Sequence, residues 1–69
     1  KVSFVVKMDV FNFAMEKVST QEFDRRRSST GSFKWNGKDD SGRIVDNGVY
    51  FIRLEYDEKV EWIKLIVVK

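Results

Sequence analysis

The chain has no cysteine and no histidine among its 69 residues. The missing cysteine excludes disulfide bridges and thiolate metal ligands. The missing histidine excludes imidazole ligands and every catalytic mechanism that relies on a histidine base. Proline is also absent, and only 4 glycines are available for backbone conformations that other residues avoid. A chain of this length forms at most one domain, so we treat residues 1–69 as a single domain.

Neither sign of charge predominates, because 13 basic and 11 acidic residues leave a net charge of only +2. Arg25, Arg26 and Arg27 form the one basic run, but Glu22 and Asp24 precede it and no aromatic residue interleaves with it. Surfaces that bind nucleic acid need clustered basic residues, often with aromatics that stack on bases. We therefore interpret the run as a solvated loop and expect no nucleic-acid partner. No apolar stretch is long enough to predict a membrane span.

What the sequence does contain is alternation of apolar and polar residues, which is typical of β-strands with one buried face. The first alternation gives one face to five apolar residues: Val2, Phe4, Val6, Met8 and Val10. A later alternation gives one face to Tyr50, Ile52, Leu54 and Tyr56, with Arg53 and Glu55 on the other. Residues 60–68 are apolar on both faces, so the pattern leaves the register of that strand open. Four or five such strands predict an all-β domain, a small antiparallel sandwich or barrel.

The segments between these strands are less distinct. Residues 13–18 (FAMEKV) fit either a helical turn or a turn into a second strand. Residues 19–32 are polar and predict a short edge strand followed by a long exposed loop. Phe33 and Trp35 alternate with polar residues and predict a short strand with both aromatics facing inward. Residues 57–59 predict a tight connection into the last strand.

The stretch WNGKDDSGRIVDNGVY, residues 35–50, carries two turn signatures. These are Asp40-Ser41-Gly42 and Asn47-Gly48. Aspartate and asparagine accept bonds from the backbone two residues on, and glycine adopts positive φ without a steric penalty. The stretch therefore predicts a structured loop that brings the aromatic residues on its two flanks, Trp35 and Tyr50, together in the interior.

Calcium binding is the competing interpretation of this stretch, because four residues offer hard oxygen ligands: Asn36, Asp39, Asp40 and Asp46. The spacing does not fit an EF-hand, since Lys38 and Arg43 lie inside the would-be loop and no glutamate closes it. We expect no metal and no cofactor. The carboxylates lie in turns or on outward faces, and so small a sheet has little volume for a catalytic pocket. We therefore expect no catalytic residues and no enzyme.

The two tryptophans would form a sugar-stacking platform if both were exposed on one face. Trp35 alternates with Phe33 and is expected in the core. Trp62 lies on the strand that is apolar on both faces, where it would pack on a neighbouring domain or copy. Together with Ile63 and Ile66, it forms the candidate interface.

The residues after position 34 follow the pattern W-x-G-x-D-D-x-G-x-x-V-x-x-G-V-Y-F-x-R-L. This pattern resembles the immunoglobulin-like domain first named in the flagellar hook-capping protein. The resemblance implies an immunoglobulin-like β-sandwich in which Trp35 anchors the core. Gly37 and Gly42 would let the chain turn, and Gly48 would start a strand with Tyr50 pointing inward. The matching residues are Trp35, Gly37, Asp39, Asp40, Gly42, Val45, Gly48, Val49, Tyr50, Phe51, Arg53 and Leu54.

The resemblance extends upstream, where residues 10–18 look like the family's I-Y-D-x-x-G-x-x-V. Here Asn12 replaces the aspartate and Met15 replaces the glycine. From these two departures we expect a turn of a different shape.

Similar modules sit at the C-terminus of many secreted bacterial proteins, and the resemblance implies the same place here. It implies a non-catalytic spacer, anchor or subunit contact of an extracellular or cell-surface protein, with residues 1–69 a C-terminal piece of a longer chain. Its partners would be preceding domains, other copies, or cell-surface and secretion proteins. The lysine-flanked end of the chain, residues 64–69, also resembles C-terminal sorting domains of type IX secretion, which is the first alternative. A flagellar hook-capping assembly scaffold is the second.

Overall fold

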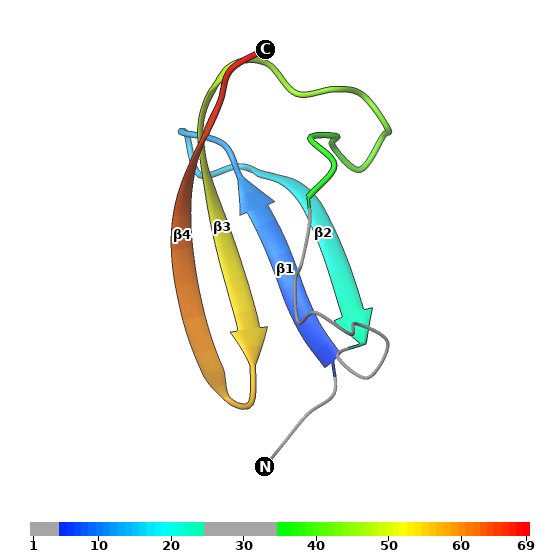
Figure 1. Cartoon of the computed structure of the whole chain (residues 1–69), viewed down its shortest axis with the longest axis vertical. Helices are drawn as coiled ribbons and strands as arrows, with labels where there is room; N and C mark the ends of the chain where they lie inside the picture. The colour runs from blue at the N-terminus through cyan, green and yellow to red at the C-terminus, as the bar shows by residue number, and fades with distance from the viewer. Residues whose placement is uncertain (1–4, 25–34) are drawn as a thin grey trace.

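The computed structural model describes residues 5–24 and 35–69, which form a four-stranded antiparallel sheet with the order β2-β1-β3-β4 (Figure 1). The prediction of an all-β fold is confirmed. The strands of the described residues all belong to this one sheet, so the two-layered sandwich stays a prediction. The strands are β1 (Val5–Phe11), β2 (Lys17–Asp24), β3 (Gly48–Tyr56) and β4 (Lys59–Val67).

One face of the sheet is buried, and we call it the core face. It carries Val6, Met8 and Val10 of β1 with Tyr50 and Ile52 of β3, all at most 9% exposed. These positions alternate along each strand because successive side chains point to opposite faces. The expected faces of β1 and β3 are therefore confirmed in the part of the chain that is described, while Val2 and Phe4 lie outside it.

The register of β4, which its apolar sequence leaves open, is set by its pairing with β3. Ile63 lies opposite Ile52 and therefore on the core face, because directly paired residues of an antiparallel sheet share a face. Trp62 lies opposite Arg53 and therefore on the other face, which we call the open face. The same alternation places Leu65 on the core face.

The connection between β1 and β2 resolves the ambiguity of residues 13–18, because it is a turn and not a helix. The amide of Asn12 donates to the carbonyl of Glu16 at 3.0 Å, and the amide of Glu16 donates to Oδ1 of Asn12 at 2.9 Å. Met15 has a φ of 64°, a left-handed backbone value that residues other than glycine rarely adopt. The turn thus keeps the backbone shape that glycine favours, although methionine occupies the position.

The tight connection predicted at residues 57–59 is a two-residue hairpin loop, since Lys59 already belongs to β4. Asp57 and Glu58 have φ values of 50° and 63°, and they join the paired residues Tyr56 and Lys59. Positive φ at both positions is the signature of a type I′ turn, whose twist matches that of the flanking strands. The residues that flank such a loop exchange both of their backbone hydrogen bonds.

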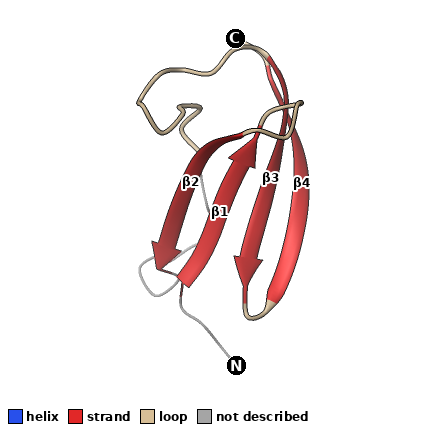
Figure 2. Cartoon of the chain, turned by 180° about the vertical axis from the view of Figure 1, so that it is seen from behind, coloured by secondary structure: helices blue, strands red, loops and turns tan. Residues whose placement is uncertain are grey.

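Residues 35–47 run as a loop at the end of the sheet where β1 ends and the chain terminates (Figures 1 and 2). Trp35 belongs to this loop, so the strand predicted at residues 33–35 is wrong for Trp35, although its ring does pack inward. Phe33 and the arginine run at residues 25–27 lie outside the described residues. Trp35 packs against the core cluster from this loop.

Replacing Met15 with glycine is expected to stabilise the fold by about 1 kcal/mol, since glycine adopts the left-handed backbone conformation without the steric strain of a side chain. A thermal melt is expected to show a midpoint about 4–8 °C higher. Ala14→Gly, one residue earlier in the same turn, is the control and is expected to lower the midpoint. A Met15→Gly protein that melts at or below the wild-type temperature would contradict the strain.

Candidate functional site

The candidate site in the sequence, the 35–47 segment, folds as a miniature hairpin. Lys38 and Ile44 form an isolated antiparallel bridge, and the amide of Val45 donates to the carbonyl of Gly37 at 2.9 Å. Gly37 and Gly42 have φ values of 75° and 87°, which glycine adopts without a steric cost. This geometry turns the chain back so that Val45, 8% exposed, joins the core cluster with Met8, Val10, Tyr50 and Ile52.

The two aromatic residues that flank the segment meet against the core face. The rings of Trp35 and Tyr50 are 5.5 Å apart and tilted by 55°, which is a favourable aromatic arrangement. The indole Nε1 of Trp35 donates to the carbonyl of Lys38 at 2.9 Å, and the hydroxyl of Tyr50 donates to the carbonyl of Asp46 at 2.7 Å. Both polar groups are therefore satisfied by backbone of the same segment, and Tyr50 is only 6% exposed.

The carboxylate of Asp39 holds the turn that follows it. Its Oδ1 accepts hydrogen bonds from the amide and hydroxyl of Ser41, at 2.9 and 2.6 Å, and from the amide of Arg43 at 3.0 Å. The hydroxyl of Ser41 contributes most to lowering the pKa of Asp39 below its ordinary value of 3.8, followed by the amide of Arg43. Hydrogen bonds that the charged form accepts favour that form. Asp39 is therefore a structural acceptor within its own loop.

Asp40 connects the segment to the sheet. Its amide donates to the carbonyl of Val18 at 2.9 Å, and its Oδ1 accepts the amide of Thr20 at 3.1 Å. Both partners lie on β2, 20 or more residues before Asp40 along the chain. These two bonds extend the edge of the sheet by a short piece of loop.

The four residues weighed as calcium ligands are thus used separately. The side chain of Asn36 accepts a hydrogen bond from the amide of Lys38 at 3.0 Å, and those of Asp39 and Asp40 accept the bonds already described. Asp46 accepts the hydroxyl of Tyr50 through its backbone carbonyl. No group of 3 or more potential ligands among histidine, cysteine, aspartate and glutamate gathers within residues 5–24 and 35–69. The side-chain oxygens of Asn36, Asp39 and Asp40 thus accept hydrogen bonds from backbone amides and stabilise the turns of the segment.

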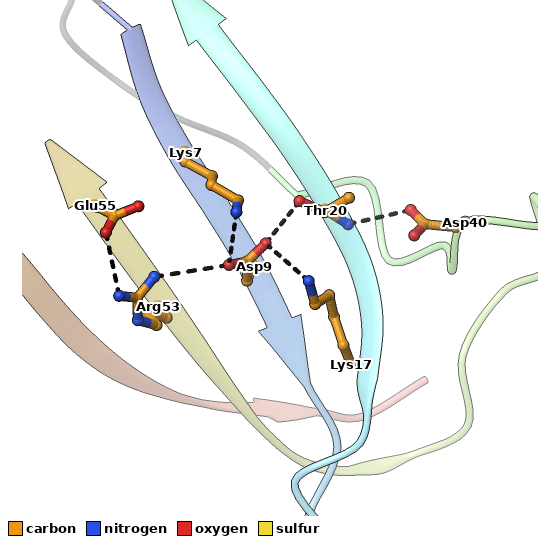
Figure 3. Close-up of polar contacts among 7 residues, drawn as sticks. All are labelled: Lys7, Asp9, Lys17, Thr20, Asp40, Arg53 and Glu55. Carbon is orange, nitrogen blue, oxygen red and sulfur yellow. Dashed lines mark hydrogen bonds and ion pairs between the residues drawn. The ribbon is translucent and has the colours of Figure 1, made fainter. Parts of the chain in front are cut away.

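An ionic cluster on the open face is a feature that sequence reasoning missed. The side chain of Asp9 is only 5% exposed, and Lys7, Lys17 and Arg53 approach its carboxylate from three strands, at 3.8–4.0 Å (Figure 3). The hydroxyl of Thr20 donates to Asp9 at 2.6 Å. The cross-strand pairing of Asp9 with Thr20 and Arg53 places these groups together. Opposite charges on alternating positions of β1 and β3 were the available signal.

Thr20 joins this cluster to the 35–47 segment. Its hydroxyl bonds Asp9 while its amide bonds the carboxylate of Asp40 (Figure 3). A single β2 residue thus connects the middle of the open face with the loop that closes the core face.

Next to the ionic cluster, the open face carries an aromatic patch, which consists of Phe11, Phe13, Phe51 and Trp62. The ring centroids of Phe11 and Trp62 are 5.7 Å apart, and those of Phe13 and Phe51 are 6.4 Å apart. Phe13 is 75% exposed and Trp62 is 51% exposed. Trp35 packs on the core face, so the two tryptophans do not share a sugar-stacking platform.

The residues of the candidate interface lie on one strand but on two faces. Trp62 and Ile66, which is 61% exposed, point to the open face, whereas Ile63, 46% exposed, points to the core face. What the three share is β4, the last strand in the order of the sheet. The apolar surface therefore follows an edge of the sheet and does not form a single flat patch.

Comparison of the chain with protein-family models, with curated protein sequences and with solved structures finds no match. The resemblance to the immunoglobulin-like domain of the hook-capping protein accordingly stays a prediction. In the described part of the chain, no helix is long and apolar enough to cross a membrane.

The lowered pKa of Asp39 predicts a specific loss of stability in acid. A carboxylate whose pKa is lower in the folded state stabilises the fold above its unfolded pKa, and the effect disappears as the pH falls through the folded value. Wild type is therefore expected to melt above Asp39→Asn at pH 6, and the gap is expected to narrow as the pH drops below 3.8. Thermal melts from pH 6 to 2 measure this gap.

Ser41→Ala is the matched variant, because it removes the hydroxyl that most lowers the pKa of Asp39. It is expected to raise that pKa in an NMR titration of the carboxyl group. A gap between wild type and Asp39→Asn that stays constant over the whole pH range would contradict the assignment.

Proposed function

We propose that the chain is a non-catalytic structural module through which an extracellular or cell-surface bacterial protein makes an assembly contact. The observation that carries the proposal is the exposure of β4, an edge strand that presents apolar side chains on both of its faces. Trp62, Ile63 and Ile66 are between 46% and 61% exposed. Edge strands with exposed apolar residues pair readily with another chain, and exposed aromatic residues are typical anchors of protein interfaces.

The chemistry of the 35–47 segment supports the same function. The carboxylates of Asp39 and Asp40 accept hydrogen bonds from backbone amides, and the donors of Trp35 and Tyr50 bond backbone carbonyls of the segment. Groups used in this way stabilise a loop and leave little capacity for binding or activating a substrate. The segment therefore serves to close the core, and the outer strand is left to make contacts.

A sorting signal for type IX secretion is the second candidate, and the exposed end of the chain favours it. Ile66 and Val68 are 61% and 80% exposed, and Lys64 and Lys69 flank them. Such a tail is accessible to a translocation machine. Fusion of residues 1–69 to a reporter in a host with this secretion route distinguishes the candidates, because retention of the reporter inside the cell would exclude sorting.

An assembly role predicts that the mass of the protein in solution depends on β4. We expect light scattering to give a molar mass above that of the monomer for wild type, rising with concentration, and a monomer mass for Ile63→Glu. Burying the new carboxylate in an apolar contact costs several kcal/mol. Ile63 is 46% exposed in the isolated chain, so the variant is expected to stay folded, which a thermal melt checks.

Ile44→Glu is the matched control, because Ile44 is 66% exposed but lies in the 35–47 segment, away from β4. It is expected to assemble like wild type. Equal masses for wild type, Ile63→Glu and Ile44→Glu would overturn the proposed contact.

A further inference from the structure

The backbone of β4 presents a defined set of hydrogen-bonding groups to its outer side. Lys59 flanks the two-residue loop at Asp57 and Glu58 and pairs with Tyr56. Its amide and carbonyl therefore point toward β3. At the other end, the amide of Lys69 also points inward, since it donates to the side chain of Asn47 at 3.0 Å. Inward and outward directions alternate along a strand. The outward amides and carbonyls therefore belong to Val60, Trp62, Lys64, Ile66 and Val68.

This edge is suited to accept another strand. The pairing of β3 with β4 runs from Gly48↔Val67 to Tyr56↔Lys59 without a register shift, and the chain contains no proline that would remove a donor. Bulges and prolines are devices that block edge pairing. Lysines are another such device, and Lys59, Lys64 and Lys69 restrict which partner strand fits.

From these features we propose that a second copy of the chain pairs antiparallel with β4, with Leu65 of one copy opposite Leu65 of the other. This inference rests on the proposed assembly function and names its partner. In the proposed register Glu61 faces the partner's Lys69, Ile63 faces the partner's Val67, and Trp62 faces the partner's Val68. Lys64 faces the partner's Ile66. Each charged pair occurs twice because the contact is symmetric.

Neighbouring registers are less favourable because of charge. A contact centred on Lys64 would place Lys64 opposite the same residue of the partner and Lys59 opposite the partner's Lys69, and like charges in directly paired positions are destabilising. A contact centred on Ile63 would place Glu61 opposite the partner's Leu65. The register centred on Leu65 pairs Glu61 with a lysine and creates no directly opposed like charges.

The backbone directions fit the same register. Leu65 points its amide and carbonyl inward, so the central pair is of the non-hydrogen-bonded type, in which side chains approach most closely. The outward groups of Trp62, Lys64, Ile66 and Val68 fall opposite one another in the two copies. They supply about eight backbone hydrogen bonds between the chains. The contact also covers the exposed side chains of Ile63 and Trp62 with the partner's Val67 and Val68.

A charge swap tests the register. Glu61→Lys and Lys69→Glu, each alone, replace two opposite-charge pairs by two like-charge pairs, and we expect each to weaken the dimer about tenfold in sedimentation equilibrium. The double variant Glu61→Lys with Lys69→Glu is expected to recover the wild-type dissociation constant. A purely local role of either side chain would not be rescued in this way.

Engineered cysteines provide a second measurement, which is unambiguous because the chain has no native cysteine. A mixture of Glu61→Cys and Lys69→Cys chains is expected to form a disulfide-linked dimer, since paired Cα atoms of this type lie about 4.5 Å apart. Glu61→Cys alone is expected to form none, because the two copies of position 61 are about 27 Å apart along the strands.

The outcomes separate this inference from the proposed function. A wild-type dimer that is insensitive to the charge swap and gives no mixed disulfide overturns the register while the assembly function stands. A wild-type chain that remains monomeric at every concentration overturns both. Weakening by the single swaps, recovery in the double variant and the mixed disulfide together support the pairing of two copies through β4.

Discussion

The contact between the 35–47 segment and the core face is the interaction on which the rest of this structure depends. A sheet of this size is not stable in water unless its apolar face is covered. In the described part of the chain the cover comes from Val45 and Trp35, which join Met8, Val10, Tyr50 and Ile52. Because glycine and aspartate turn the backbone at fixed points, these two side chains reach the core without a further strand.

The same constraint explains why the polar residues of the segment are structural. A loop that covers a core must satisfy its own amides and carbonyls. Asp39 satisfies the amides of Ser41 and Arg43, and Asp40 satisfies an amide of β2. The carboxylates that make the sequence look like a cation site are thus the groups that allow the turn to exist. The assembly contact that we propose accordingly uses a surface that the core does not, along β4.

Much of the sheet could be predicted because polar residues separate the apolar ones from Val6 to Val10 of β1 and from Ile52 to Tyr56 of β3. The register of β4 could not, since a strand that is apolar on both faces carries no such signal; only its pairing with β3 separates Ile63 from Trp62 and Ile66. The left-handed backbone at residue 15 could not be predicted, because methionine occupies a position where a glycine would have indicated positive φ. The burial of Asp9 was missed because it depends on long side chains from neighbouring strands that fold over it.

Trp35 shows a different limit. Alternation with Phe33 placed it correctly toward the interior but in a strand, whereas it reaches Tyr50 from a loop. Local pattern reports which side chains are buried more reliably than it reports the backbone that carries them. The contact between the rings of Trp35 and Tyr50 could be predicted, because the turn-forming residues between them are local in sequence.

Amide hydrogen exchange tests most directly whether the 35–47 segment closes the core. The amides of Val45, Asp40 and Thr20 donate to Gly37, Val18 and Asp40 respectively, so the account predicts that they exchange as slowly as amides in the middle of β1 and β3. Opening them would require the sheet to lose its cover, which couples them to global unfolding. Exchange of these three amides at the rate of an unstructured peptide, while the strands stay protected, would contradict it.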